Sequence, residues 1–404
     1  MGAMTDSRTP RTVIHVITRL DWGGSAQNTL LTAVGHDRSR FVPLVVAGAI
    51  GQWDDQGGLQ ASDEQGKILR QAGVRWQVLS SLTRELSPIK DVIALWAMIR
   101  LFRRERPAIV HTHTSKAGAL GRIAARMAGV PVLVHTPHGH VYYGHFGRFL
   151  SWLFLRIERM LARMTTSMIA LTEAEKEDHL SQRVGSRDTF AVIPSGIDVE
   201  RFRRVAAGAG ARPPGTAYPD GAFVIGSVGW LTPVKGHAVL IEALARLKPK
   251  YPTAHLLLIG SGGLRDDLNN LAAKLGVASS VDLLGMRTDV PECLGAMHCF
   301  VLPSLNEGMG RALVEAMAAA RPVVASHVGG IPAIVENRRT GLLVPAGDAD
   351  ALAAAIGDVI ASPELSRALG QAARDRIDAT FSVPAMVRAV EAVYDEALKR
   401  TGTA

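Results

Sequence analysis

Short, nearly continuous apolar runs rich in Val and Ile alternate with stretches of helical periodicity through the first half of the chain. Such runs are typical of strands that are buried on both faces of a sheet. The predicted strands are Thr12–Thr18, Val42–Ala47, Ala108–Thr112, Pro131–Thr136, Ser167–Leu171 and Ala191–Pro194. Helical patterns lie between them, for example at Asp91–Arg104 and Gly118–Ala128. This alternation predicts βαβ units and therefore a parallel sheet.

The alternation stops at about residues 203–220, where the run Gly-Ala-Gly-Ala-Arg-Pro-Pro-Gly predicts a linker. It then restarts, with strands predicted at Phe223–Val228, His255–Ile259, Val281–Leu284, Cys299–Pro303, Pro322–Ala325 and Leu342–Val344. We therefore predict an α/β fold with two Rossmann-like, doubly wound parallel-sheet domains facing a central cleft. The predicted domains are residues 1–203 and 204–382. A last helix over 383–404 is expected, by analogy with other two-domain folds, to cross back to the first domain.

Composition narrows the class of protein. The 404 residues are 47% hydrophobic and 20% charged, which is typical of a globular chain, and the net charge of +8 favours anionic partners. Nucleic acid is not expected, because the basic residues are spread out and no nucleic-acid module is recognisable. The two cysteines, Cys293 and Cys299, form neither a disulfide framework nor a zinc motif, so a cytoplasmic protein is expected. Cys299 lies in an apolar run and is predicted to be buried, and no apolar run reaches the roughly 20 residues of a membrane span.

The most informative stretch runs from Pro303 to Met317, where a strand ends, a glycine-bearing loop follows and a helix begins near Gly310. Ligands of open α/β sheets bind outside the carboxyl ends of the strands, and free N–H groups at a helix N-terminus attract phosphate. Glu307 would lie in the loop and Glu315 in the helix, where carboxylates suit hydroxyl-rich ligands. A helix-capping Glu307 with a solvated Glu315 is an equal alternative on chemistry alone.

These two glutamates also match a known signature. With seven residues between them, Glu307 and Glu315 fit the E-x7-E pattern of retaining glycosyltransferases of family 4, which have the GT-B fold. Other stretches resemble the same family in order and spacing: Pro194–Asp198 with Arg201-Phe202, Gly229–Gly236, Gly329–Pro332, and Gly341–Val344 with Asp348. The resemblance implies transfer of a hexosyl group from a nucleotide-sugar to a hydroxyl, with retention of anomeric configuration.

The resemblance also implies roles for individual residues. Glu307 would bind the sugar hydroxyls and Glu315 the ribose, while Lys235 and backbone amides would hold the diphosphate. The expected donor-binding residues are Gly23, Gly24, Lys235, Glu307, Gly308, Met309, Gly310, Arg311 and Glu315. The expected catalytic residues are Lys235, Glu307 and His138, and the expected acceptor-binding residues are Lys116 and His138.

Lys235 follows the first strand of the second half, in a stretch that resembles the phosphate-binding loop of the family. A fixed ammonium there would stabilise the charge that a nucleoside diphosphate gains as it leaves. A surface lysine in a turn is the alternative. The family usually has Arg at the position of Trp230, and Arg311 is expected to compensate for the missing guanidinium.

Loops after three strands of the first half are expected to reach the substrates. Gly23 and Gly24 follow the first strand, where an ordinary flexible turn is the alternative. His138 follows another strand, where the family carries a His near the donor sugar. A metal site among His135, His138 and His140 is disfavoured, because no carboxylate or Cys cluster accompanies them and GT-B enzymes need no bound metal. Lys116 would face a phosphate of the acceptor, and a solvated lysine is nearly as well supported.

Two other patterns allow a second interpretation. Asp348-Ala349-Asp350 is similar to the metal-binding carboxylates of another glycosyltransferase fold, but it precedes a predicted helix, which favours Asp348 as an N-cap. Residues 146–164 combine aromatic and basic side chains on a helical pattern and, with the arginines between Arg100 and Arg106, suit an anionic membrane surface. A helix that packs on the sheet and turns its arginines to solvent is slightly favoured.

We therefore expect a metal-independent, retaining hexosyltransferase without a cofactor, which uses a UDP-sugar rather than a GDP-sugar. Its expected setting is cell-surface polysaccharide or glycolipid synthesis, in the cytoplasm or at the inner face of the membrane. A sugar-nucleotide epimerase and a non-catalytic sugar-nucleotide-binding protein are the alternatives. A nicotinamide dehydrogenase is disfavoured, because no G-x-G-x-x-G follows a predicted strand. The sequence leaves the acceptor and the oligomeric state open.

Overall fold

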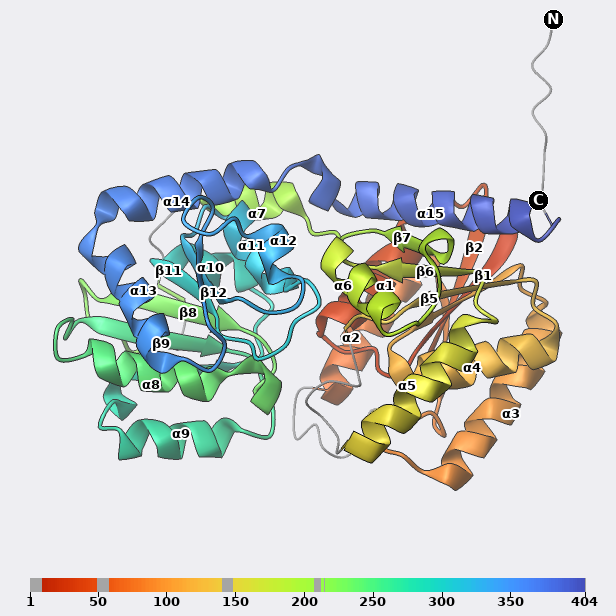
Figure 1. The fold of residues 1–404 in the computed structure, drawn as a ribbon, viewed down its shortest axis with the longest axis horizontal. Coiled ribbons are helices and arrows are strands. Elements are labelled where there is room, and N and C mark those ends of the chain that lie inside the picture. Colours follow the sequence, from red (N-terminus) through yellow and green to blue (C-terminus); the bar gives the residue numbers. More distant parts are fainter. Residues whose placement is uncertain (1–8, 49–57, 140–147, 207–211, 214, 404) are drawn as a thin grey trace, which may run out of the picture. The chain divides into compact units, whose positions relative to one another are not determined.

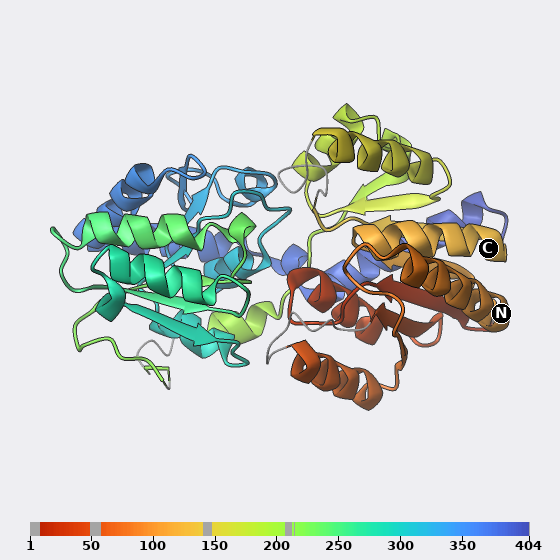
Figure 2. The same cartoon turned by 90° about the horizontal axis from the view of Figure 1, so that it is seen from below.

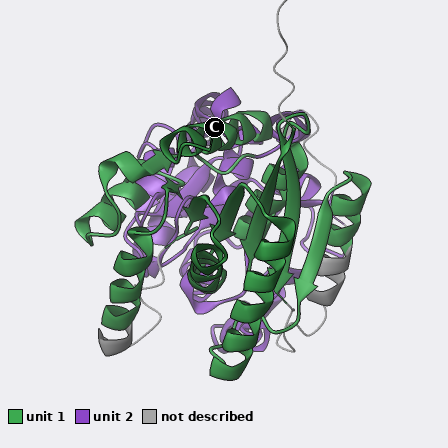
Figure 3. Ribbon diagram, turned by 90° about the vertical axis from the view of Figure 1, so that its right-hand side faces the viewer, with its two compact units in different colours: residues 1–196, 383–404 green, residues 197–382 purple. Residues whose placement is uncertain are grey.

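The computed structural model describes residues 9–48, 58–139, 148–206, 212–213 and 215–403, and the chain divides into two compact units (Figures 1 and 3). Unit 1 comprises residues 1–196 with 383–404, and unit 2 comprises residues 197–382. The predicted α/β fold with two parallel-sheet domains is confirmed. The division falls at Gly196 rather than at residue 203, because helix α7 (Val199–Ala206) packs against α10 (Val290–Ala296) and α11 (Arg311–Ala318) of unit 2.

Unit 1 contains a seven-stranded parallel sheet in the order β3-β2-β1-β4-β5-β6-β7. Its strands are β1 (Arg11–Ile17), β2 (Phe41–Gly48), β3 (Arg75–Leu79), β4 (Ile109–His113), β5 (Val132–Thr136), β6 (Ser167–Ala170) and β7 (Phe190–Val192). Its helices are α1 (Gly24–Gly35), α2 (Gly58–Gln71), α3 (Pro88–Glu105), α4 (Ser115–Ala128), α5 (Arg148–Ala162), α6 (Glu173–Ser181) and α15 (Val383–Arg400).

Alternation along β1 shows why both faces of this sheet are apolar. Ile14 and Val16 pack with α3 and α4, whereas Val13 lies with α15 and Ile17 with α1 on the other face. Successive side chains of a strand point to opposite faces, so a strand between two helix layers must be apolar at nearly every position. Figure 2 shows helices on both sides of the sheet.

Strand β3 is the one strand of unit 1 absent from the sequence prediction. It reads Arg-Trp-Gln-Val-Leu, lies at the edge of the sheet beside β2, and buries only its last side chain. An edge strand has one neighbour and more exposed positions, so it lacks the continuous apolar run on which the other predictions were based.

Unit 2 contains a six-stranded parallel sheet in the order β10-β9-β8-β11-β12-β13. Its strands are β8 (Phe223–Val228), β9 (Ala254–Ile259), β10 (Val281–Gly285), β11 (Cys299–Leu302), β12 (Val323–Ser326) and β13 (Leu342–Val344). Its further helices are α8 (His237–Leu247), α9 (Arg265–Lys274), α12 (Ile331–Ile334), α13 (Ala349–Ala361) and α14 (Pro363–Arg376). All six strands were predicted within two residues of these bounds, and the predicted burial of Cys299 is confirmed.

The structure can be compared with the predictions for the linker and for the last helix. Residues 203–206, predicted as the start of a linker, belong to helix α7, and residues 207–211 and 214 of that linker lie outside the described residues. The last helix, α15, is part of unit 1, where it packs against α1 and β5 (Figure 3). None of the helices in the described ranges is both long enough and apolar enough to cross a membrane.

Candidate active site

Each sheet has one place where the strand order reverses, and the predicted donor-binding residues gather at these places. In unit 2 the reversal lies between the adjacent strands β8 and β11. Lys235 ends the short helix η2 (Pro233–Lys235) after β8, and Glu307 lies in the loop after β11. Crevices at such points, outside the carboxyl ends of the strands, are where open α/β sheets bind ligands.

The structure brings Lys235 and Glu307 into direct contact. Nζ of Lys235 lies 2.5 Å from Oε2 of Glu307, and the hydroxyl of the buried Ser304 donates to the same oxygen at 3.1 Å. Both side chains remain partly exposed, at 24% for Lys235 and 15% for Glu307. The ion pair therefore fixes an ammonium at the switch point of the unit 2 sheet, and its partial exposure leaves it accessible to an anion.

Two glycines hold the loops of this crevice close together. Gly236 has a φ of +67°, and a Cβ there would lie 2.0 Å from the carbonyl oxygen of Pro303. Gly329 has a φ of +50°, and a Cβ there would lie 2.0 Å from the carbonyl oxygen of Glu307, which accepts a hydrogen bond from the backbone of Gly330. Only glycine fits such positions, so the loops carrying Lys235 and Glu307 are pinned by backbone contacts.

Helix α11 begins directly after the Glu307 loop. Gly310 is its N-cap with a φ of +75°, and Met309 before it is buried, whereas Gly308 is half-buried. The first amides of the helix have no partner within the helix itself, which is the arrangement that binds phosphate oxygens.

Arg311 and Glu315 occupy one face of α11, a turn apart. Nε of Arg311 donates to Oε1 of Glu315 at 2.9 Å, so Arg311 is held by its own helix. Burial raises the pKa of Glu315, and the charge of Arg311 acts in the opposite direction. Nη1 of Arg311 is buried and has no hydrogen-bond partner among the described residues. A buried guanidinium N–H in this state suits an anionic oxygen of a ligand.

In unit 1 the strand order reverses between β1 and β4. Gly24 opens helix α1 directly after β1, and Gly23 is its N-cap, with its backbone N–H donating to the carboxylate of Asp21 at 2.8 Å. The helix start is therefore at the switch point of this sheet, as a glycine-bearing phosphate loop requires.

His138 lies just beyond the carboxyl end of β5. Its φ is +59°, a value that non-glycine residues rarely adopt, and the following Gly139 has its backbone N–H bound by the carboxylate of Glu175 at 2.9 Å. Nε2 of His138 is 3.0 Å from Nδ1 of His113. Burial lowers the pKa of His138 to about 3, so its imidazole is neutral at physiological pH. His140, which was part of the same sequence pattern, lies outside the described residues.

Lys116, like Lys235, is ion-paired with a carboxylate. Its Nζ lies 2.5 Å from Oδ1 of Asp91 in α3 and also donates to the carbonyl oxygen of Glu85, and its side chain is 13% exposed. Its charge is thus already compensated within unit 1, and its role toward an acceptor stays a prediction.

A set of buried histidines near His138 was not predicted from the sequence. His15 in β1 and His111 in β4 are register partners, and His113 follows two residues later on the same face. The sequence signal was present, because His-x-His in an otherwise apolar strand predicts two polar side chains on one buried face. That pattern could not predict their hydrogen-bond partners His36, at the end of α1, and Tyr394, on α15.

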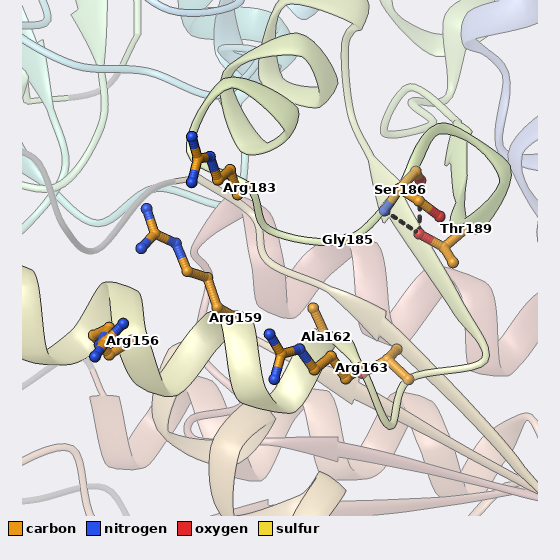
Figure 4. A pocket seen from close by; sticks show the side chains of 9 residues that line it. Arg156, Arg159, Ala162, Arg163, Arg183, Gly185, Ser186 and Thr189 are labelled. Carbon is orange, nitrogen blue, oxygen red and sulfur yellow. Dashed lines mark hydrogen bonds between the residues drawn. The ribbon is translucent and has the colours of Figure 1, made fainter.

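Unit 1 also carries an arginine-lined pocket of about 460 Å³, shown in Figure 4. Arg156 and Arg159 extend from α5, Arg163 lies in the turn directly after it, and Arg183 comes from the turn after α6. The pocket adjoins Thr165, which precedes β6, so it lies at the amino end of that strand and away from the edge that carries His138. The helix predicted over residues 146–164 is present as α5, residues 146–147 lie outside the described residues, and Arg156 and Arg159 of α5 line this pocket.

The interpretation of Asp348 as a helix cap is confirmed. Its side chain accepts from the backbone N–H groups of Asp350 and Ala351 at the start of α13. These bonds satisfy two of the free amides of that helix.

Comparison with known proteins agrees with this geometry. Residues 213–376 match the family model described as glycosyl transferases group 1, and residues 23–196 match that of a glycosyl transferase 4-like domain. A UDP-Gal:alpha-D-GlcNAc-diphosphoundecaprenol alpha-1,3-galactosyltransferase of Escherichia coli is 32% identical over 324 residues, which are 80% of this chain and 84% of that one. The capsular polysaccharide biosynthesis glycosyltransferase CapM of Staphylococcus aureus is 28% identical over 341 residues, or 83% of this chain and 89% of that one.

Solved structures share the fold over nearly the whole chain. Anabaena Alr3699/HepE in complex with UDP and glucose superimposes with a TM-score of 0.77 at 23% identity, covering 96% of this chain and 100% of that one. Sucrose-phosphate synthase from Thermosynechococcus elongatus gives 0.78 at 21% identity, with 96% and 100% covered. From its matching family models and its relatives, the chain belongs to the family 4 glycosyltransferases of the GT-B fold, which take the transferred sugar from a nucleotide-sugar.

Proposed function

We propose that the chain is a retaining, metal-independent hexosyltransferase in which Lys235 and Arg311 receive the diphosphate of the donor. The observation that carries this proposal is the Lys235–Glu307 ion pair at the reversal of the unit 2 sheet, next to the free amides that open α11. Glu307 would bind the sugar hydroxyls, and Glu315 would bind the ribose. The departing phosphate would accept the proton of the attacking hydroxyl on the same face of the sugar, since no described residue is placed as a nucleophile.

We further propose UDP-hexose as the donor and a lipid-linked glycan as the acceptor. The Escherichia coli relative is named for a UDP-Gal donor and a diphosphoundecaprenol-linked acceptor, and the Anabaena structure holds UDP. The relative from Staphylococcus aureus is named for capsular polysaccharide biosynthesis. These relatives support a role in cell-surface polysaccharide synthesis, which we place on the cytoplasmic side of the membrane.

A thermal-shift screen with UDP-, GDP-, ADP- and CMP-sugars tests the donor. A ligand that binds only the folded state raises the melting temperature by mass action, and at 100 times its Kd it adds roughly 2.7 kcal/mol to the free energy of unfolding. We expect the largest rise with a UDP-sugar, little rise with the Lys235→Ala variant, and the same rise in the presence of EDTA. A rise confined to GDP-, ADP- or CMP-sugars would refute the donor assignment.

Product analysis separates transfer from the two alternatives. We expect nucleoside diphosphate to be released at a substantial rate only when a hydroxyl acceptor is present, and the new glycosidic bond to keep the anomeric configuration of the donor. Interconversion of sugar-nucleotides without release would indicate an epimerase. Donor binding with no turnover over a panel of lipid-linked acceptors would indicate a binding protein.

We also propose that unit 1 contacts an anionic membrane through α3 and α5. On α3 the large apolar side chains Ile89, Val92, Ile93 and Trp96 are all more than half exposed, at helical spacing that places them on one face. On α5, Trp152 is 52% exposed. Basic residues at the end of α3 and along α5 add the charge that attracts an anionic lipid surface.

Flotation with anionic vesicles tests this surface. Burying an Ile or Trp side chain contributes about 1.5–3 kcal/mol each, so Ile89→Asp with Trp96→Asp should lower the vesicle-bound fraction by well over tenfold. The control is Leu275→Asp, which places one such carboxylate on an exposed apolar position after α9 in unit 2 and should leave binding unchanged. Equal binding by the double variant and the wild type would end the proposal.

A further inference from the structure

A chain of four histidines runs through the core of unit 1 from helix α15 to His138. Oε1 of Glu391 on α15 lies 3.1 Å from Nδ1 of His36, whose Nε2 is 3.0 Å from Nε2 of His15. Nδ1 of His15 is 3.2 Å from Nε2 of His113, and Nδ1 of His113 is 3.0 Å from Nε2 of His138. The first three histidines and Glu391 are at most 5% exposed.

The carboxylate at the far end is held in its ionised form. Burial alone would raise the pKa of Glu391, but hydrogen bonds from His36 and from the backbone of Asp37 outweigh burial and hold that pKa below its usual range. The N–H of Asp37 donates to Oε1 at 2.8 Å, and Arg40 donates to Oε2 at 3.2 Å. An ionised carboxylate only accepts hydrogen bonds, so Nδ1 of His36 must carry its proton.

With a neutral His36 this assignment fixes the others, whereas a His36 cation would donate from both nitrogens and reverse each step. A neutral imidazole donates from one nitrogen and accepts at the other. With Nδ1 of His36 as donor, its Nε2 accepts from Nε2–H of His15. Nδ1 of His15 then accepts from Nε2–H of His113 in the same way. Nδ1 of His113 must accept from Nε2–H of His138, which leaves Nδ1 of His138 without a proton.

Burial supports neutral rings at His15, His113 and His138. It lowers the pKa values of His15 and His113 well below the usual range, with neighbouring histidines adding to the effect, and it lowers that of His138 to about 3. A hydrogen-bonded row of neutral rings, unlike a row of cations, is compatible with a buried site.

Such a cluster of histidines could instead bind a metal ion. Ligand atoms of His15, His111 and His113 lie within 4.8 Å of one another. All six ring nitrogens of these residues are nevertheless in hydrogen bonds, with His111 bound to the hydroxyls of Tyr394 at 2.7 Å and Thr136 at 2.8 Å. An ion would have to break several of these bonds, so the geometry favours the hydrogen-bonded row.

We propose that Glu391 is a positioning residue that sets, through the intervening rings, the tautomer of His138, so that Nδ1 of His138 accepts a hydrogen bond from a substrate hydroxyl. No hydrogen bond to that nitrogen is present among the described residues, and His138 is half-buried at the edge that carries the unit 1 site. The substrate part of this proposal rests on the proposed transferase function, whereas the tautomer part does not.

Long-range ¹H–¹⁵N correlation spectra of ¹⁵N-histidine-labelled protein report the tautomer directly. His138 and His36 are assigned by the loss of their signals in His138→Gln and His36→Gln. We expect the Nε2–H form at His138 and the Nδ1–H form at His36 in the wild-type protein without ligand. The Nδ1–H form at His138, a doubly protonated His36, or zinc binding that displaces the ring signals would overturn the proposal without any need for a Glu391 variant.

Variants of Glu391 then test the connection. Glu391→Leu should let His138 populate both tautomers, whereas Glu391→Gln keeps an oxygen that accepts from His36 and should preserve the wild-type pattern. The matched control is Asp395→Asn on the same helix, because Asp395 pairs with Arg40 and not with a histidine. An unchanged His138 tautomer in Glu391→Leu would refute the connection.

Steady-state kinetics test whether His138 accepts a hydrogen bond from the substrate. Because only the molecules with the accepting tautomer bind productively, Glu391→Leu with both tautomers about equally populated should raise the KM for the nucleotide-sugar about twofold. Its Kd for the nucleoside diphosphate alone should not change, and Glu391→Gln should restore the KM. A changed tautomer with an unchanged KM would refute contact between His138 and the substrate. If the wild-type protein transfers no sugar, the spectra still decide the tautomer part, so the two proposals fail separately.

Discussion

Replacing Lys235 by alanine is expected to lower kcat at least about 100-fold, which corresponds to roughly 2.7 kcal/mol of lost transition-state stabilisation. The ammonium is fixed 2.5 Å from Glu307 at the switch point of the unit 2 sheet, where the diphosphate is proposed to bind. Charge on the leaving diphosphate grows as the glycosidic bond breaks, so a fixed cation stabilises the transition state more than the ground state. The variant would also leave the Glu307 carboxylate unpaired beside the phosphates.

The control for this prediction is Lys274→Ala, which removes one exposed positive charge from the end of α9 in the same unit. It should keep kcat within about twofold, since an exposed lysine away from the crevice makes little difference to the site. Both variants are compared by initial rates of nucleoside diphosphate release, after thermal melts show that each is folded. Turnover of Lys235→Ala near the wild-type value would reject the role of Lys235.

The largest expected effect on stability follows from truncating Glu158. Its carboxylate receives two hydrogen bonds, at 2.8 and 2.9 Å, from Nη2 of Arg122, whose side chain is fully buried between α4 and α5. Nε of Arg122 donates to the carbonyl oxygen of Gly118. Glu158→Ala would leave a buried guanidinium without its counter-ion, which typically costs about 3–5 kcal/mol of the free energy of unfolding.

Urea unfolding of the unit 1 transition measures this loss. The matched control is Glu177→Ala, which breaks a salt bridge with Arg187 that is about half exposed on both sides, and exposed pairs contribute only about 0–1 kcal/mol. Replacing both buried partners, as Arg122→Met with Glu158→Leu, should recover most of the lost stability, because no buried charge remains. A loss below about 1 kcal/mol for Glu158→Ala would show that Arg122 is satisfied by other means.

A local sequence pattern identifies the segments that carry the site residues, but it does not predict which distant residues these side chains contact. The segment around Glu307 is recognisable from a buried strand, a glycine-bearing loop and the start of a helix, all within a short stretch. That Glu307 binds Lys235, which lies in the loop after a different strand, is a contact between residues 72 positions apart. Likewise, Lys116 had the appearance of a free cation in the sequence, and only the fold shows its ion pair with Asp91.

The sequence by itself determined the two parallel sheets, twelve of their strands, the cap at Asp348 and the family, because these depend on the order and spacing of residues along the chain. Strand β3 lacked a continuous apolar run, because an edge strand pairs with a single neighbour, here β2, and leaves more of its side chains exposed. Only the tertiary structure decided the partners of buried polar groups, such as Glu391 on the last helix beside His36 near the first. A charged or polar side chain is stable in a core only when other groups complete its hydrogen bonds. These groups come from segments far away in the sequence, so no local sequence pattern indicates which residues they are.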